Sequence, residues 1–154
     1  MLIEPDWPTQ LTIIGQLILA MALGGLIGFE RELANKPAGF RTHTLVAGAA
    51  ALFMAVAAAA PAYLHASGVV EVDPLRVAAA IVTGVSFLGA GTIFRGGDGE
   101  RIGGLTTAAT IWMAAAVGVT VALGQLIVAT GVTVIALVVL RVLGHLALHN
   151  RRRE

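Results

Sequence analysis

Residues 103–140 read GGLTTAATIWMAAAVGVTVALGQLIVATGVTVIALVVL and contain no charged side chain. One helix over this run would be about twice as long as needed to cross the ~30 Å hydrocarbon core of a bilayer, which about 20 apolar residues span. Gly124 and Gln125 supply a short turn in the middle of the run. The sequence therefore predicts a hairpin of two transmembrane helices, over about 103–123 and 125–148.

Three further apolar segments of membrane length precede this hairpin, over about 9–29, 42–64 and 75–94. Of the 154 residues, 57% are hydrophobic and 12% are charged, and the mean hydropathy is +0.87. Because a soluble domain carries about 25% charged residues, this chain has too little charge to cover a surface in water. We predict one all-α domain over residues 1–154, an integral membrane bundle of five transmembrane helices.

The basic residues predict the orientation of this bundle. If there are five spans, nine of the ten basic residues lie on one side, in the first loop, the third loop and the C-terminal tail. These nine are Arg31, Lys36, Arg41, Arg95, Arg101, Arg141, Arg151, Arg152 and Arg153. Only Arg76 lies on the other side. Because cytoplasmic loops carry the excess of Lys and Arg, we expect the N-terminus outside and the C-terminus in the cytoplasm.

Local signals predict where two of these helices begin. Asp73 followed by Pro74 is typical of an N-cap and a first helical residue. Residues 36–39, Lys-Pro-Ala-Gly, indicate a turn. After that turn, the hydroxyl of Thr42 or Thr44 is expected to cap the second helix.

Small residues recur along the predicted helices and indicate close helix packing. In lipid, removing side chains lets helix backbones approach, because dispersion contacts replace the hydrophobic effect there. The predicted packing positions are Gly24, Gly28, Gly84, Ser86, Gly89, Gly91 and Trp112. Trp112 is expected in the interior because it is too deep in its helix for the interfacial belt. The alternative interpretation is a pair of closely apposed helices lining a narrow site.

The first and third loops hold the candidate functional surface, because both face the predicted cytoplasmic side. The candidate residues are Glu30, Arg31, Lys36, Gly39, Arg41, Thr42, His43, Arg95, Thr106 and Thr107. Basic groups and hydroxyls that converge near helix N-termini suit an anion or an acidic segment of a partner. The alternative is an intramolecular lattice that locks the loops, for example Glu30 paired with Arg41 or Arg95.

Several function classes are disfavoured by what the sequence lacks. No acidic or basic residue occupies the middle of a predicted span, whereas Mg²⁺ usually needs carboxylate oxygens. We therefore expect no cofactor, and any metal site stays unassigned. The chain has no nucleophile–base pair and no cysteine, and its net charge is +1, so we expect neither an enzyme nor a nucleic-acid partner. Ion transport remains an alternative through a path between subunits. Its predicted lining residues are Thr83, Ser86, Thr92, Thr106 and Thr110.

Five motifs together resemble the MgtC/SapB family, in order and spacing, from about Leu17 to Gly124. They are GFERE at 28–32, KPAGFRTHTLV at 36–46, DPLRVAA at 73–79, FLGAG at 87–91 and GLTTAATIW at 104–112. Ala80 and Ser86 depart from the family's usual glutamine and glycine. The chain resembles a short form without the soluble C-terminal domain of longer relatives.

The resemblance implies a multi-pass protein of the bacterial inner membrane, in a family linked to growth in low magnesium and to survival inside host cells. Its best-known members are thought to act on other membrane proteins, including the proton-translocating ATP synthase. Magnesium transport was an earlier proposal. We therefore expect a non-enzymatic protein in magnesium-limitation or envelope stress adaptation. It would act within the lipid bilayer, as a homo-oligomer or on another inner-membrane protein. Transport of Mg²⁺ or another small ion is the alternative, and a purely structural oligomer organised by the glycine faces is a third hypothesis.

Overall fold

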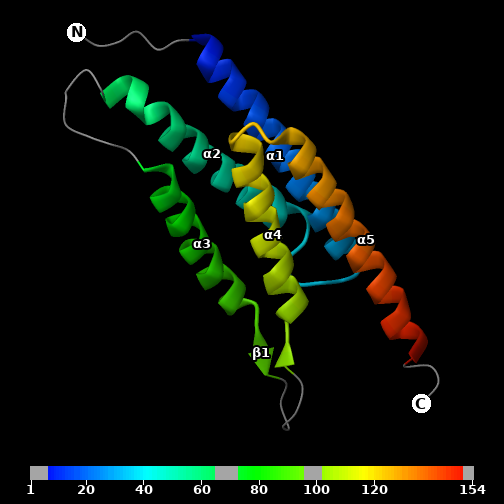
Figure 1. The fold of residues 1–154 in the computed structure, drawn as a ribbon. Helices are drawn as coiled ribbons and strands as arrows, with labels where there is room; N and C mark the ends of the chain where they lie inside the picture. The colour runs from blue at the N-terminus through cyan, green and yellow to red at the C-terminus, as the bar shows by residue number, and fades with distance from the viewer. Residues whose placement is uncertain (1–6, 65–72, 96–101, 151–154) are drawn as a thin grey trace.

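The computed structural model describes residues 7–64, 73–95 and 102–150. Over these residues it contains five α-helices and one two-stranded antiparallel hairpin, as Figure 1 shows. The elements in chain order are α1 (Trp7–Leu33), α2 (Phe40–Leu64), α3 (Pro74–Gly91), β1 (Phe94–Arg95), β2 (Ile102–Gly103), α4 (Leu105–Ala122) and α5 (Leu126–Asn150). The predicted bundle of five helices is confirmed.

The helices run alternately up and down the molecule (Figure 1). Helices α1, α2 and α4 pack on one another, α5 lies against α1 and α4, and α3 contacts α2 and α4. Residues 34–39 and the β1–β2 hairpin lie at the same end of the bundle, which we term the hairpin end. The first and third loops therefore lie at one end of the bundle.

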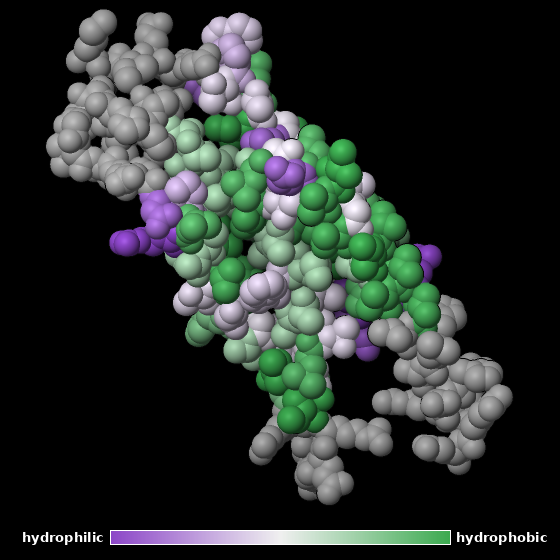
Figure 2. Space-filling view, viewed as in Figure 1, coloured by the Kyte–Doolittle hydropathy of each residue, from purple (hydrophilic) through white to green (hydrophobic). Residues whose placement is uncertain are grey.

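The lengths of the helices fit a membrane. Four of them are long and apolar enough to cross one, over residues 7–33, 40–59, 74–91 and 105–122, and the described apolar part of α5 is shorter, Leu126–Val142. Hydrophobic side chains cover α5 in Figure 2. Helix α3 differs from the others, because only 11% of its span is buried within the chain, against 33 to 44% for α1, α2 and α4.

Glycines bring three helices into backbone contact. A Cβ atom at Gly24 would lie 2.8 Å from the carbonyl oxygen of His43, and one at Gly28 would lie 2.7 Å from the carbonyl oxygen of Gly39. A Cβ at Gly118 of α4 would lie only 2.2 Å from the carbonyl oxygen of Ala47 in α2. Only glycine permits such approaches, so α1 and α4 both pack directly on the backbone of α2.

The third helix ends earlier than the sequence predicts. It stops at Gly91 rather than at residue 94, and the chain then forms β1 and β2, which the sequence did not predict. Strands of two residues give no periodic pattern to recognise. Gly104 connects β2 to α4. Its φ of +85° favours glycine, and a Cβ built there would overlap the carbonyl oxygen of Thr92.

The second helix begins earlier than predicted, at Phe40. Thr42 and Thr44 therefore lie inside the helix, and their predicted capping role is wrong. The carboxylate of Glu32, near the end of α1, accepts a hydrogen bond from the Phe40 backbone N–H at 2.8 Å. The cap comes from the preceding helix, which a local reading of the turn does not reveal.

Two other predicted boundaries are confirmed. Asp73 is the N-cap of α3 and accepts a hydrogen bond from the Leu75 backbone N–H at 2.9 Å, with Pro74 as the first helical residue. The chain turns between α4 and α5 at Gly124, which has a φ of +74°.

Candidate functional site

Five polar side chains are buried at the hairpin end, in the contact between α1, α2 and α4. They are Glu30, Arg31, His43, Thr107 and Thr110, which we term the buried polar cluster. The cluster exists because Gly24 and Gly28 bring α1 against the first turns of α2, so that side chains near these helix ends are covered by neighbouring backbone. Buried polar groups of this kind need hydrogen-bond partners.

His43 connects two helices within this cluster and is completely buried. Its Nδ1 lies 2.9 Å from the carbonyl oxygen of Gly39, one helical turn earlier in the chain. Its Nε2 lies 3.0 Å from the hydroxyl oxygen of Thr110 in α4. The Thr110 hydroxyl also lies 2.9 Å from the carbonyl oxygen of Thr107. A chain of three polar contacts therefore joins α2 to α4.

Glu30 and Arg31 form a buried ion pair on α1, with 9% and 5% of each residue exposed. Arg31 Nε donates a hydrogen bond to Glu30 Oε2 at 2.5 Å. The predicted pairing of Glu30 with Arg41 is wrong, because Arg41 is exposed and the neighbouring Arg31 neutralises the carboxylate. Two charges that are buried together must be paired, so removing either one leaves an uncompensated charge.

The predicted functional surface is divided by the structure into a buried and an exposed part. Glu30, Arg31, His43 and Thr107 are buried, and Gly39 is half-buried. Lys36, Arg41, Thr42 and Thr106 are exposed. Arg95 lies in β1, at the same end of the bundle. These residues gather at one end, but as a buried cluster with an exposed rim rather than as one continuous surface.

Sequence reasoning missed two members of this region. Glu32 is not among the predicted site residues, although its carboxylate accepts a hydrogen bond from the first residue of α2. Thr110 is predicted only to line an ion path, although it is the α4 partner of His43. The spacing of Thr107 and Thr110, three residues apart and on one helix face, was the available signal.

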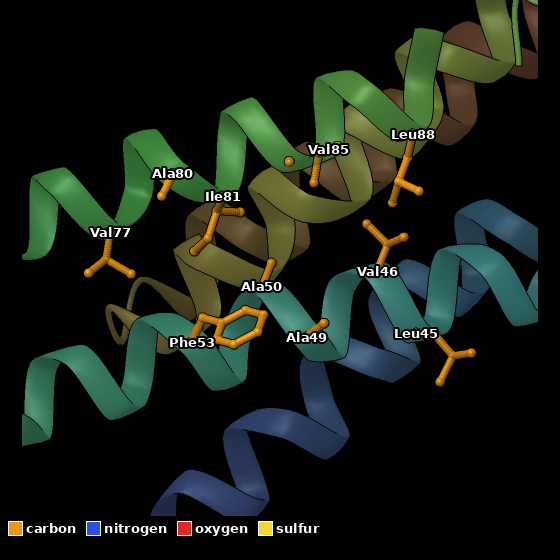
Figure 3. Close-up of a pocket in the computed structure, with 11 residues that line it drawn as sticks. Leu45, Val46, Ala49, Ala50, Phe53, Val77, Ala80, Ile81, Val85 and Leu88 are labelled. Atoms are coloured by element: carbon orange, nitrogen blue, oxygen red, sulfur yellow. The ribbon is translucent and has the colours of Figure 1, made fainter. Parts of the chain in front are cut away.

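A second feature is an apolar groove between α2 and α3, with a cavity of about 600 Å³ (Figure 3). Its lining residues are Leu45, Val46, Ala49, Ala50, Phe53, Val77, Ala80, Ile81, Gly84, Val85 and Leu88. All of them are apolar. We term this feature the α2–α3 groove.

The small residues of α3 have few contacts within the chain. Among the described residues, no atom of another helix lies within 4 Å of a Cβ built at Gly84 or Gly91, and one at Gly89 would make only ordinary contact with Ala108, at 3.5 Å. Ser86 is exposed, and its hydroxyl donates to the carbonyl oxygen of Val82 in its own helix. Within the described part of one chain Gly84, Ser86 and Gly91 are not closely packed, and their packing against a helix of another chain stays a prediction.

Trp112 lies on the outside of α4, with 45% of its surface exposed. Its expected interior position is wrong for the single chain. The core-facing residues of α4 include Ile111, Ala114 and Ala115, and Trp112 is turned about 100° from Ile111 around the helix axis.

The residues predicted to line an ion path are not brought together within the chain. Thr83 and Ser86 are exposed on α3, whereas Thr110 is buried against His43. Among the described residues, no group of three or more His, Asp or Glu side chains could hold a metal ion.

Comparison with known proteins supplies the family. A model of the MgtC family matches residues 17–148. The putative magnesium transporter YhiD of Escherichia coli K12 is 43% identical over 127 residues, which are 82% of this chain and 58% of that protein. Protein MgtC of Salmonella typhimurium 14028s is 44% identical over 121 residues, 79% of this chain and 48% of that protein. Protein MgtC of Brucella abortus 2308 is 51% identical over 100 residues, 65% of this chain and 38% of that protein.

The chain thus spans about half the length of these curated relatives. No solved structure matches it. The family match extends from within α1 to near the end of α5, and four of the helices are long enough to cross a membrane. The resemblance stated from the motifs is confirmed: the chain is a multi-pass membrane protein and belongs to the MgtC family.

Proposed function

We propose that this chain is a non-enzymatic protein of the bacterial inner membrane that acts in magnesium homeostasis by binding a transmembrane helix of another membrane protein. The observation that carries this proposal is the α2–α3 groove. It is lined only by apolar side chains, and one of its walls is a membrane-length helix that is 11% buried within the chain. The association with magnesium rests on the relative YhiD, which is named as a putative magnesium transporter.

The chemistry of the groove favours a helix as its occupant. Inside a bilayer, an apolar segment must satisfy its own backbone hydrogen bonds, and a helix does so. Helices associate in lipid where small residues expose backbone. Ala49 and Ala80 line the groove, and Gly84 leaves room for a full side chain. The groove therefore offers the close backbone approach that a second helix needs.

A matched pair of substitutions tests this proposal. Gly84→Leu places a large side chain in the α2–α3 groove, whereas Gly131→Leu adds the same side chain to α5, also where nothing lies within 4 Å. Both variants should insert and fold. Only Gly84→Leu should fail to restore growth in low magnesium to a strain that lacks its MgtC-family protein. Equal growth of the two folded variants would contradict the proposal.

Cross-linking identifies what occupies the groove. The chain contains no cysteine, so single cysteines report on one position each. Ala80→Cys faces the groove, and Ile127→Cys, at 89% exposed, is the control on α5. A cross-link from Ala80→Cys alone to a transmembrane helix of a different protein, lost in Gly84→Leu, supports the proposal. If Ala80→Cys cross-links only to another copy of this chain, the groove binds a second copy and not a different protein. If it cross-links only to lipid, no helix occupies the groove, which contradicts the proposal.

Transport of Mg²⁺ is the second candidate function. It is favoured by the relative YhiD, which is named as a putative magnesium transporter, and by Thr83 and Ser86, which are exposed on α3. A second copy of the chain could enclose their hydroxyls in a path between subunits. Sealed proteoliposomes that contain only this chain separate the two candidates. Saturable Mg²⁺ uptake that falls when Thr83→Val and Ser86→Ala are combined would establish transport. No uptake by inserted, folded protein would leave helix binding as the function.

A further inference from the structure

Three polar contacts around His43 could each use a proton, whereas a neutral ring and the Thr110 hydroxyl supply two between them. Three contacts form one chain: Nδ1 to the Gly39 carbonyl at 2.9 Å, Nε2 to the Thr110 hydroxyl at 3.0 Å, and that hydroxyl to the Thr107 carbonyl at 2.9 Å. Both carbonyl oxygens can only accept. A neutral imidazole carries one N–H and threonine one O–H, so two protons serve three contacts, whereas an imidazolium provides all three.

The neutral state has one arrangement that avoids a clash of lone pairs. Because the Gly39 carbonyl can only accept, Nδ1 must carry the proton. Nε2 is then an acceptor, and the Thr110 hydroxyl turns to donate to it. The Thr107 carbonyl then loses its contact with the Thr110 hydroxyl, but it still accepts a backbone hydrogen bond within α4.

Protonation of the ring reverses the direction of one hydrogen bond. Nε2–H then donates to the Thr110 oxygen, and the hydroxyl turns back to donate to the Thr107 carbonyl. Only hydrogen atoms move, since the three heavy-atom distances already suit the protonated network. Hydrogen bonds from a charged donor are about twice as strong as neutral ones, and this gain opposes the cost of burying the charge of the imidazolium. The strength of the contact between α2 and α4 therefore depends on whether the ring is protonated.

We propose that His43 is a proton-binding site and that its single proton switches the hydrogen bonding between α2 and α4. The charged groups that α1 brings to the site are Arg31, whose positive charge repels a positive charge on the ring, and Glu30, which is paired with Arg31. From α4 the ring meets the Thr110 hydroxyl, and residues 105–122 of that helix include no Asp, Glu, Lys, Arg or His. The bundle thereby gains a pH-dependent contact that is separate from the α2–α3 groove.

Nuclear magnetic resonance of the whole chain in lipid nanodiscs tests the proposal, with ¹⁵N-labelled histidine and His43→Gln to assign the signal. At a pH about two units above the ordinary histidine pKa of about 6.5, we expect the His43 ring to carry one proton, on Nδ1. As the pH falls, both nitrogens should become protonated while the helix content stays constant. A proton on Nε2 alone at high pH, or a ring that stays neutral until the helices unfold, would overturn the proposal.

Substitutions of threonine test the partner of the ring. In Thr110→Val, the neutral ring should keep its Nδ1 proton, but the Nε2 proton of the acidic form should lose its protection from exchange with water. Thr110→Ser keeps the hydroxyl and should keep both states, which covers the case in which valine prevents folding. Thr120→Val is the matched control, because the Thr120 hydroxyl donates to the Ala116 carbonyl within its own helix. Unchanged protection in folded Thr110→Val would refute the network.

Discussion

Replacing Gly118 by alanine measures how much stability depends on the contact between α4 and α2. The added Cβ would lie 2.2 Å from the carbonyl oxygen of Ala47 and 3.0 Å from its carbonyl carbon. These are backbone atoms, so no side chain can turn aside. The two helices must separate by roughly 1 Å to restore an ordinary contact, and overpacking of this kind costs about 3 kcal/mol at the upper end of its range. Alanine returns about 1 kcal/mol through its better helix propensity, which leaves a net loss of about 2 kcal/mol.

Gly131→Ala is the matched control, because nothing lies within 4 Å of its added Cβ. That substitution should stabilise α5 by up to about 1 kcal/mol. The assay is unfolding of both variants by SDS in mixed micelles, followed by circular dichroism. The same substitution in two helices should thus change the free energy of unfolding in opposite directions. Equal stability of the two variants would refute the inference that α4 packs on the backbone of α2.

Two further predictions address the hairpin end. Glu32→Ala removes the carboxylate that accepts a hydrogen bond from the Phe40 N–H, and it should destabilise the protein by about 1 kcal/mol in the same SDS assay. Glu32→Gln keeps an acceptor and should lose less stability. Equal losses of stability would show that the carboxylate does not cap α2. We also propose that the hairpin end faces the cytoplasm, so a membrane-impermeant thiol reagent applied to intact spheroplasts should label Arg76→Cys but not Lys36→Cys, and the reverse pattern would invert the topology.

The sequence predicted the parts of the fold that depend on local composition. The length of the apolar runs gives the number of helices, and Gly124 separates α4 from α5 because an uninterrupted helix would be too long for a bilayer. Asp73 caps α3 through atoms only two residues away. These features need no knowledge of which helices are neighbours.

The candidate site was harder to predict because it depends on which helix faces meet. Gly24 and Gly84 are the same residue type in similar apolar surroundings, yet one lies against α2 and the other meets nothing within 4 Å. Glu30 finds its partner in the adjacent Arg31, a pairing that requires both side chains to be buried on the same side of α1. His43 lies inside the predicted second helix, but the sequence does not reveal that its ring faces Thr110 of α4 and is completely buried.

The backbone contacts at Gly24, Gly28 and Gly118 divide the molecule into a stiff part and a compliant part. Helices α1, α2 and α4 interlock main chain against main chain, and such packing resists gradual deformation. Helix α3 approaches α4 less closely, because a Cβ built at Gly89 would make only ordinary van der Waals contact with Ala108, at 3.5 Å. A change in the tilt of α3 would move side-chain contacts such as those of Val85 with α2 and α4, but it would leave the main-chain contacts of α1, α2 and α4 in place. A mechanical response of this bundle to its surroundings would therefore begin with α3.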